Sequence, residues 1–252
     1  MLRNPISGAL SNALRPPFGA SGAAGSPLQQ AVIAAWDMQE ESGPLLPAKG
    51  GIEIPAFNSP GFTADGPASG IRARRALADS AQKFETATEL ARSAFDLRQA
   101  KTITGWFRSN STRAGDVRWL FGGSSDQVSD ANGQWSLRPG GSFWGFRIRQ
   151  SDGTVRVAAQ STYTNNAWLF VAMSYDGISQ GLLRTWNGST LTESALTTTA
   201  QPNAPTASTK FDISAFGSGV NLDSSLLNVH EGVLTDAQLV EIYSDPRVFA
   251  NL

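Results

Sequence analysis

The chain has 252 residues, with 20 basic and 21 acidic side chains and a net charge of −1. Like charges are not grouped anywhere in the sequence, which disfavours nucleic-acid binding through a basic stripe and membrane-surface binding through a basic amphipathic helix. The absence of cysteine excludes disulfides and thiolate metal sites. No run of about 18 apolar residues predicts membrane insertion, and no N-terminal apolar stretch has the length of an export signal.

The composition favours an all-β protein. Hydrophobic residues make up 40% of the chain and charged residues only 16%, while Gly, Ser, Thr and Asn are abundant. Many short strands joined by tight turns have this composition. A β-sandwich of this length is often a single domain, so one core is sufficient.

The first 30 residues are predicted to form an N-terminal arm that attaches the protein to a partner. They are rich in Gly, Ala, Ser and Pro, a composition that cannot bury enough apolar surface to fold alone. Ile6, Leu10 and Leu14 recur every four positions, and Phe18 adds a fourth apolar side chain. We expect the arm to become ordered only within an assembly. A disordered leader with incidental apolar residues is the alternative.

Residues 31–252 are predicted to form the folded domain. A strand opens it at residues 31–38, and residues 45–75, with many prolines and glycines, are expected to be loops with short β segments. Turn dipeptides such as Asn165-Asn166 and Asn187-Gly188 separate the later strands. The clearest strands are predicted at Lys101–Ser109, Val117–Gly123, Gln134–Pro139, Phe143–Gln150, Val155–Ser161, Ala167–Asp176 and Leu182–Gly188.

Two of these strands show which faces are buried. In residues 143–150, Trp144 and Phe146 share one face while Arg147 and Arg149 share the other, so one side is buried and one solvated. The segment 167–176 is apolar on both faces, which is typical of a central strand covered on both sides.

A short helix is predicted near the C-terminus. Thr235 is a suitable N-cap, Gln238 completes a capping box, and Leu234 can pack against Leu239. Asp245-Pro246 ends the helix. Many strands followed by one helix, without a repeat of 20–50 residues, favour a two-sheet sandwich.

Four segments in order resemble the concanavalin A-like lectin/glucanase superfamily, particularly its laminin-G-like domains. They are AWDMQEESGP from Ala35, KTITGWFRS, AWLFVAMSYDG, and the closing SSLLNVHEGVLTDAQLVEIYSDP. The resemblance implies an antiparallel jelly-roll sandwich of two sheets over residues 31–250. Lectins, hydrolases, adhesion domains and viral surface proteins share this fold, so it does not by itself indicate a function.

The terminal helix followed by Asp-Pro-Arg-Val-Phe, and the arm before the domain, are similar to tailed-bacteriophage structural proteins. This resemblance implies a non-enzymatic virion structural or adsorption protein, such as a tail, fibre or capsid-decoration component. We expect it to contact other virion proteins through residues 1–30, to form a homo-oligomer and to bind host surface glycans. The alternative is a secreted or surface carbohydrate-binding lectin.

No catalytic constellation is found. Retaining glucanases of this fold need an acid and a nucleophile about 5 Å apart, and the Glu-x-Asp-x-x-Glu pattern that supplies them is absent. Glu85 and Glu89 are interpreted as surface residues. His230 is the only histidine and no Gly-x-Ser-x-Gly elbow accompanies it, so a structural role is expected.

No cofactor is predicted. One histidine and no cysteine cannot supply the usual zinc ligands. Calcium is left open, because Asp176 and Asp223 stand at expected turns and could provide carboxylates. The alternative is that each hydrogen-bonds its own turn backbone.

The sequence has seven tryptophans. Those that alternate with apolar residues are predicted to be core: Trp106, Trp144 and Trp168. Others lie near turns and arginines, and they are the candidate carbohydrate-binding surface: Trp119, Trp135 and Trp186, with Arg138. The alternative is that these tryptophans lie at the edge of the core, where arginine stems pack against them.

Overall fold

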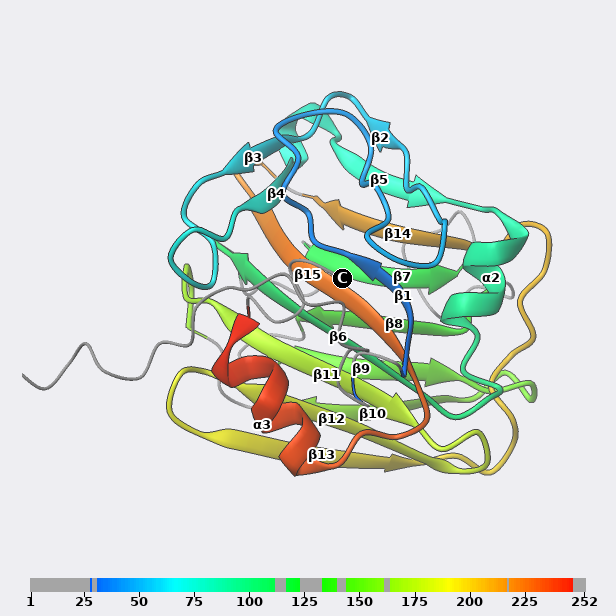
Figure 1. The fold of residues 1–252 in the computed structure, drawn as a ribbon. Coiled ribbons are helices and arrows are strands. Elements are labelled where there is room, and N and C mark those ends of the chain that lie inside the picture. The colour runs from blue at the N-terminus through cyan, green and yellow to red at the C-terminus, as the bar shows by residue number, and fades with distance from the viewer. Residues whose placement is uncertain are drawn as a thin grey trace, which may run out of the picture.

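A computed structural model describes Leu28 and residues 31–111, 117–122, 133–139, 144–160, 164–216 and 218–246. The described chain forms two antiparallel sheets packed face to face, as Figure 1 shows. This arrangement confirms the predicted all-β sandwich.

The sheet nearer the viewer in Figure 1, here the front sheet, has the strand order β13-β12-β11-β6-β15-β4-β3, and β1 also pairs with β15. Its long central strands β6 and β15 pair with each other, with a register shift between Ser225 and Asn228. The strands are β1 (Val32–Trp36), β3 (Gly61–Thr63), β4 (Ala73–Leu77), β6 (Lys101–Ser109), β11 (Leu169–Tyr175), β12 (Gln180–Trp186), β13 (Leu191–Thr197) and β15 (Asn221–Glu231).

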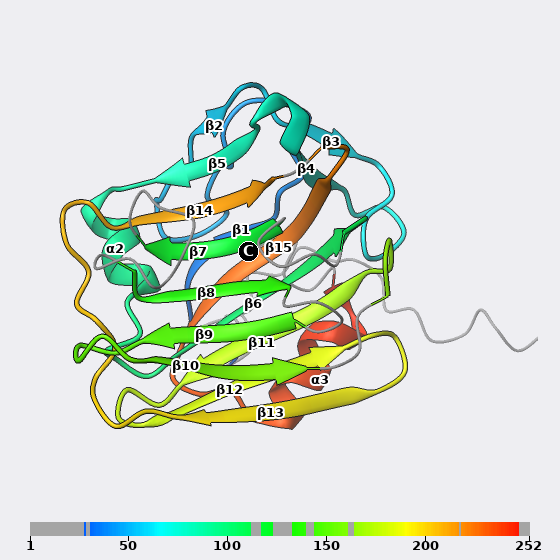
Figure 2. The same ribbon diagram turned by 180° about the vertical axis from the view of Figure 1, so that it is seen from behind.

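The second sheet, here the back sheet, faces the viewer in Figure 2 and has the order β10-β9-β8-β7-β14-β5-β2. Short helical segments connect some strands: the 3-10 turn η1 (Ala78–Ser80) and α2 (Glu89–Phe95). The strands are β2 (Ala56–Phe57), β5 (Lys83–Thr86), β7 (Val117–Gly122), β8 (Trp135–Pro139), β9 (Trp144–Arg149), β10 (Val155–Gln160) and β14 (Lys210–Ala215).

The main core lies between the sheets and is rich in aromatic rings. Phe95, at the end of α2, stacks on Phe211 with ring centroids 3.9 Å apart. Trp119 fits against Gly105 of the facing sheet so closely that a Cβ on this glycine would lie 2.4 Å from the indole ring. A side chain at position 105 is therefore excluded by packing.

A second core covers the outer face of the front sheet. Helix α3 (Asp236–Ser244) lies there in Figure 1, and Leu239 and Ile242 pack against Trp106 and Phe170. The predicted capping box is confirmed: Thr235 accepts from the Gln238 backbone N–H, and the Gln238 side chain accepts in return. Strand β11 is buried throughout, as predicted for a central strand.

The predicted arm residues Ile6, Leu10, Leu14 and Phe18 lie outside the described residues. Leu28, within the same predicted segment, is buried in the second core. None of the helices in the described part of the chain is long and apolar enough to cross a membrane.

Candidate functional site

The structure corrects the predicted glycan surface at two of its tryptophans. Trp119 and Trp135 are 1% and 0% exposed, because each points from the back sheet into the core. Their indole N–H groups are also used there: Trp119 donates to Ser224 Oγ at 3.2 Å, and Trp135 to the Phe95 carbonyl at 2.9 Å. A sugar ring cannot stack on either, and the alternative of core tryptophans holds for both.

Trp186 is half-buried on the outer face of the front sheet. Tyr243 of α3 stacks on it at 4.5 Å with an interplanar angle of 10°, and Trp106 meets it edge-on at 5.8 Å. One face of this indole is therefore covered by the protein. Trp168, predicted to be core, is also only half-buried, and the Arg108 guanidinium lies 4.8 Å over its ring.

Arg138 is the fourth residue of the predicted glycan surface. It lies on β8, and the structure does not bring it together with Trp186, which belongs to the other sheet. Burial lowers the pKa of its guanidinium, and the charge of Arg118 lowers it further.

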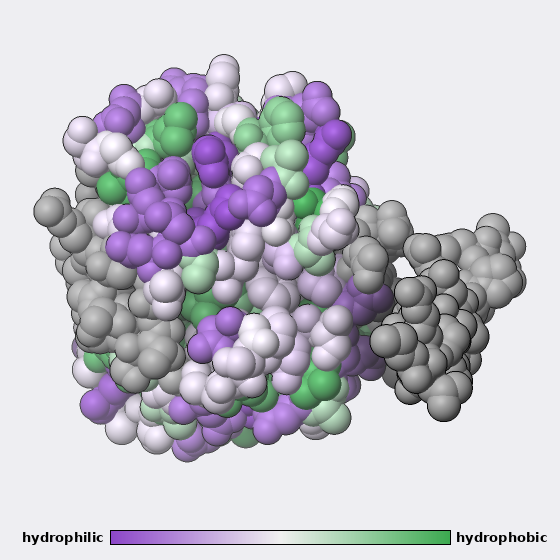
Figure 3. Space-filling view, turned by 90° about the vertical axis from the view of Figure 1, so that its left-hand side faces the viewer, coloured by the Kyte–Doolittle hydropathy of each residue, from purple (hydrophilic) through white to green (hydrophobic). Residues whose placement is uncertain are grey.

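The carboxylate of Asp223 forms ion pairs with two arginines. It is 1% exposed and accepts from Arg75 at 2.6 and 2.9 Å and from Arg108 at 2.9 and 3.0 Å. Arg108 extends the network to the exposed Asp65. Figure 3 views the molecule from the side on which β3 and β4 lie in Figure 1, and hydrophilic residues gather over the upper half of this view. Two guanidinium groups already neutralise the Asp223 carboxylate, so it has no unbalanced negative charge left for a calcium ion.

Asp176 caps its own turn, as the alternative interpretation expected. One carboxylate oxygen accepts backbone N–H groups from Ile178, Ser179 and Gln180 at 2.8, 2.8 and 2.9 Å. Burial raises the pKa of this carboxyl, but the three backbone hydrogen bonds outweigh it and lower the pKa overall.

The two predicted calcium ligands are also far apart. Asp176 follows Tyr175, which pairs with Lys101 at the start of β6, whereas Asp223 pairs with Arg108 near its end. Strand residues advance about 3.3 Å each, so these carboxylates cannot share one ion. No group of three or more His, Cys, Asp or Glu side chains suited to a metal occurs among the described residues.

His230 is a buried structural residue, 0% exposed in β15. One ring nitrogen lies 3.1 Å from Thr104 Oγ1 on the neighbouring strand. Burial lowers the pKa of the imidazole from 6.5 to about 3, with a smaller contribution from the charge of Lys49.

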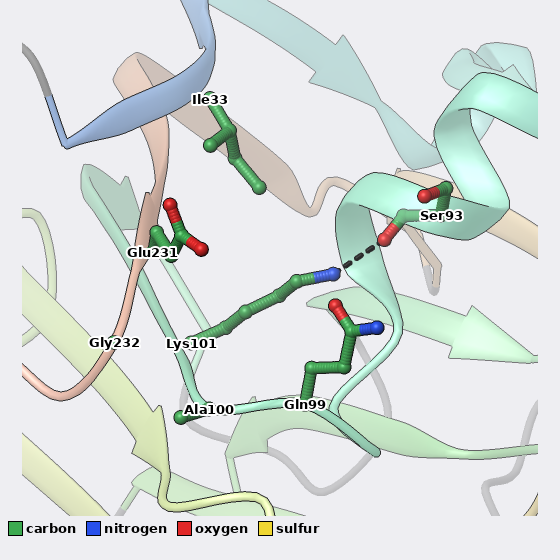
Figure 4. Close-up of a pocket in the computed structure, with 7 residues that line it drawn as sticks. All are labelled: Ile33, Ser93, Gln99, Ala100, Lys101, Glu231 and Gly232. Atoms are coloured by element: carbon green, nitrogen blue, oxygen red, sulfur yellow. Dashed lines mark hydrogen bonds between the residues drawn. The ribbon is translucent and has the colours of Figure 1, made fainter.

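A pocket of about 480 Å³ opens where the start of β6, the end of β15, the start of β1 and α2 meet, as Figure 4 shows. Lys101 reaches across it and donates to the Ser93 carbonyl of α2, and Glu231 and Gln99 approach from its other sides. The lining residues are Ile33, Ser93, Gln99, Ala100, Lys101, Glu231 and Gly232.

The electrostatics of this pocket are those of a lysine and a glutamate on neighbouring strands. Lys101 is 4% exposed, and burial lowers the pKa of its ammonium while Asp96 and Glu231 partly oppose the shift. Lys101 and Glu231 are register partners at the ends of β6 and β15. The Glu231 side chain is exposed, so the pocket offers a buried cation and a solvated anion.

This pocket is not apparent from the sequence. Its residues come from β1, from α2 and the loop after it, and from the ends of β6 and β15, and the pairing of β15 with both β1 and β6 brings them together. The sequence feature that could have indicated the pocket is a charged residue at the end of an otherwise buried strand, as at Lys101 and Glu231.

Neither a protein-family model nor a curated protein matches the chain. Solved structures do match, at low identity. The binding domain of Paraclostridial Mosquitocidal Protein 1 matches with a TM-score of 0.63 and 12% identity, covering 86% of this chain and 52% of that one. The binding domain of botulinum neurotoxin serotype D matches with a TM-score of 0.62 and 10% identity over 85% and 51%.

A third match is the binding domain of botulinum neurotoxin DC in complex with SialylT, with a TM-score of 0.60 and 12% identity over 86% and 52%. The chain therefore spans about half the length of the structures that it matches. At these identities the likeness shows a shared fold, a β-sandwich found in binding domains.

Proposed function

We propose that this protein is a non-catalytic recognition module that binds a carbohydrate in the pocket beside Lys101. The pocket carries the proposal. Its size lies within the range of roughly 300–1,000 Å³ that is typical of small-ligand sites. The fold supports the proposal by analogy, because the matching structures are binding domains and one was solved with SialylT.

The lining groups suit hydroxyl-bearing ligands. A sugar hydroxyl both donates and accepts a hydrogen bond, and the pocket offers the Lys101 ammonium as donor, the Glu231 carboxylate as acceptor and the Gln99 amide as both. Ile33 adds an apolar surface for the C–H face of a sugar ring. Lys101 is held in place by its bond to Ser93, so little ordering is needed on binding.

The same lining argues against glycoside hydrolysis at this pocket. Glu231 is the only carboxylate among the described residues that line it. Retaining and inverting hydrolases both need a second carboxylate within about 10 Å, placed on the other side of the scissile bond. We therefore propose binding without turnover.

The proposal is tested by measuring carbohydrate binding on a panel of neutral and acidic oligosaccharides, followed by calorimetry on the best ligand. Glu231→Gln and Gln99→Ala should each weaken binding about tenfold, the effect of one lost polar contact of about 1.4 kcal/mol. Glu53→Gln, at an exposed position away from the pocket, is the matched control. Absence of binding across the panel, or equal affinity of the pocket variants and the control, would contradict the proposal.

The more specific hypothesis of a phage virion adsorption protein, attached through residues 1–30 and homo-oligomeric, stays a prediction, as does the alternative of a secreted lectin. The attachment hypothesis is tested by removing residues 1–27, which keeps the buried Leu28. The truncated protein should melt like the full chain and fail to enter the assembly. Normal incorporation of the truncated protein would exclude the arm as the attachment segment.

A further inference from the structure

Arginines gather on the outer face of the back sheet, on the strands β7, β8 and β9. The alternation of these strands sends Trp119, Leu137 and Phe146 into the core and the residues between them outward. We call the outward set the arginine face, and it consists of Arg118, Arg138, Arg147 and Arg149.

The register brings like charges side by side. Trp119 pairs with Leu137 across antiparallel strands; Arg118 directly precedes Trp119 and Arg138 directly follows Leu137, so both arginines lie on the same side of this pair. Arg138 in turn pairs with Gly145 of β9. Like charges opposite each other across a sheet are unfavourable, so this arrangement lowers the stability of the sheet.

The Arg147 guanidinium folds back along β9 over the same glycine. A Cβ on Gly145 would lie 3.3 Å from Nη1 of Arg147 and 3.5 Å from its Cζ. Because Arg138 is the register partner of Gly145, the two side chains start from the same small area of the sheet. A glycine within a strand commonly marks a place where another group approaches the backbone closely.

The two arginines differ from Arg118 in their partners. Arg118 pairs with the buried Asp212 at 3.5 Å and lies over the Phe216 ring. By contrast, Nε of Arg138 and Nη1 of Arg147 are buried and make no hydrogen bond within the described part of the chain. Burial lowers the pKa of Arg147 to about 10, and the charge of Arg138 adds to the shift. Buried, unpaired donors of one charge favour an anion that would satisfy them.

We propose that Arg138 and Arg147 together bind an oxyanion group, a sulfate, phosphate or carboxylate, of a ligand that lies on the back sheet. Guanidinium groups match such anions because their planar fork donates two parallel hydrogen bonds. The site is separate from the pocket beside Lys101, since none of the arginine face lines that pocket. The inference therefore does not depend on the proposed carbohydrate site.

The test uses calorimetric titration of the full chain with inorganic sulfate, a sulfated disaccharide and its unsulfated counterpart. Arg138→Gln and Arg147→Gln should each weaken binding of the anionic probes about tenfold, and Arg147→Lys should fall between the wild type and the glutamine variant, because lysine keeps the charge without the fork. Arg92→Gln, on α2 and outside the arginine face, is the matched control, and thermal melting checks that each variant folds.

The probes separate two sources of the same chemistry. Binding of both inorganic sulfate and the sulfated sugar indicates a site for the anion itself, and binding of the sulfated sugar alone indicates a site that also recognises the carrier. Either result supports the proposal when Arg138→Gln and Arg147→Gln reduce it and Glu231→Gln does not. Failure of both anionic probes to bind, or wild-type affinity of both arginine variants, would overturn it without affecting the pocket.

Discussion

The outer faces of the two sheets place arginines in opposite electrostatic settings. On the front sheet, Arg75 and Arg108 are both register partners of Asp223, so opposite charges alternate across three neighbouring strands. On the back sheet, Arg118 and Arg138 stand side by side, and Arg147 folds toward Arg138. The first arrangement stabilises a sheet and the second does not.

This difference separates structural arginines from candidate binding arginines. Arg74 is a structural arginine: its buried guanidinium donates to five backbone carbonyls, lies 3.7 Å from the Glu40 carboxylate and lies 5.0 Å from the centre of the Phe84 ring. Arg138 and Arg147 have buried nitrogens with no hydrogen-bond partner among the described residues. Where the fold does not satisfy a buried guanidinium nitrogen, water or a ligand must supply the hydrogen bond.

Removing the shared carboxylate of the front sheet should have the largest effect. Asp223→Asn leaves Arg75 and Arg108 facing each other with only the exposed Asp65 as a counter-charge, which should cost about 3 kcal/mol of unfolding free energy. Denaturant unfolding measures the loss. Asp65→Asn is the control, because its carboxylate is 77% exposed and an exposed pair contributes at most about 1 kcal/mol. Equal losses of unfolding free energy in the two variants would show that the buried Asp223 contributes no more than the exposed Asp65.

The buried imidazole of His230 is neutral in the folded protein near pH 7, so no charge is buried there. Its pKa is lowered to about 3 in the fold, against 6.5 for the ordinary side chain, so the unfolded chain binds the proton more readily between these values. Stability should therefore fall as pH drops from 6.5 toward 3, by about 3 kcal/mol between pH 6.5 and 4. Unfolding measured across this range should show a shallower slope in His230→Gln. An unchanged slope would assign the acid sensitivity to other groups.

The stability of α3 on the outer face of the front sheet should depend on the N-cap of this helix. Thr235→Ala removes the side chain that accepts from Gln238, which should cost about 1 kcal/mol. Hydrogen exchange should show faster opening of α3 with little change in the back sheet. Thr235→Ser keeps the hydroxyl and is expected to behave like the wild type. Equally faster exchange in both sheets would show that α3 does not open independently of the sandwich.

The sequence predicted most of the strands because burial in a sandwich leaves a local pattern. The segments predicted at 101–109 and 117–123 appear as β6 and β7 with nearly the same ends. Strand β13 was missed because its exposed and half-buried residues alternate weakly, and β14 because it follows a long polar loop. Strand β5 was likewise missed, and it has only four residues.

The candidate sites were less predictable because they depend on pairing between distant segments. Asp223 meets Arg75 and Arg108 across 148 and 115 positions, so nothing near it in the sequence showed that its charge was already balanced. Trp119 lies near a turn, which suggested exposure, yet its strand turns the ring inward. Sequence alternation correctly placed Arg147 on the opposite face from Trp144, but it could not show that Arg147 would lie beside Arg138.

The most direct test of the contrast between the two faces compares the unfolding free energy of the wild type and the Arg138→Gln/Arg147→Gln double variant, in chloride and in sulfate at equal ionic strength. In chloride, relief of repulsion should make the double variant at least as stable as the wild type, by up to about 1 kcal/mol. In sulfate, the wild type should gain more stability than the variant, because an anion that binds only the folded state stabilises it. A double variant that is less stable in chloride and gains as much from sulfate as the wild type would show that these arginines are structural.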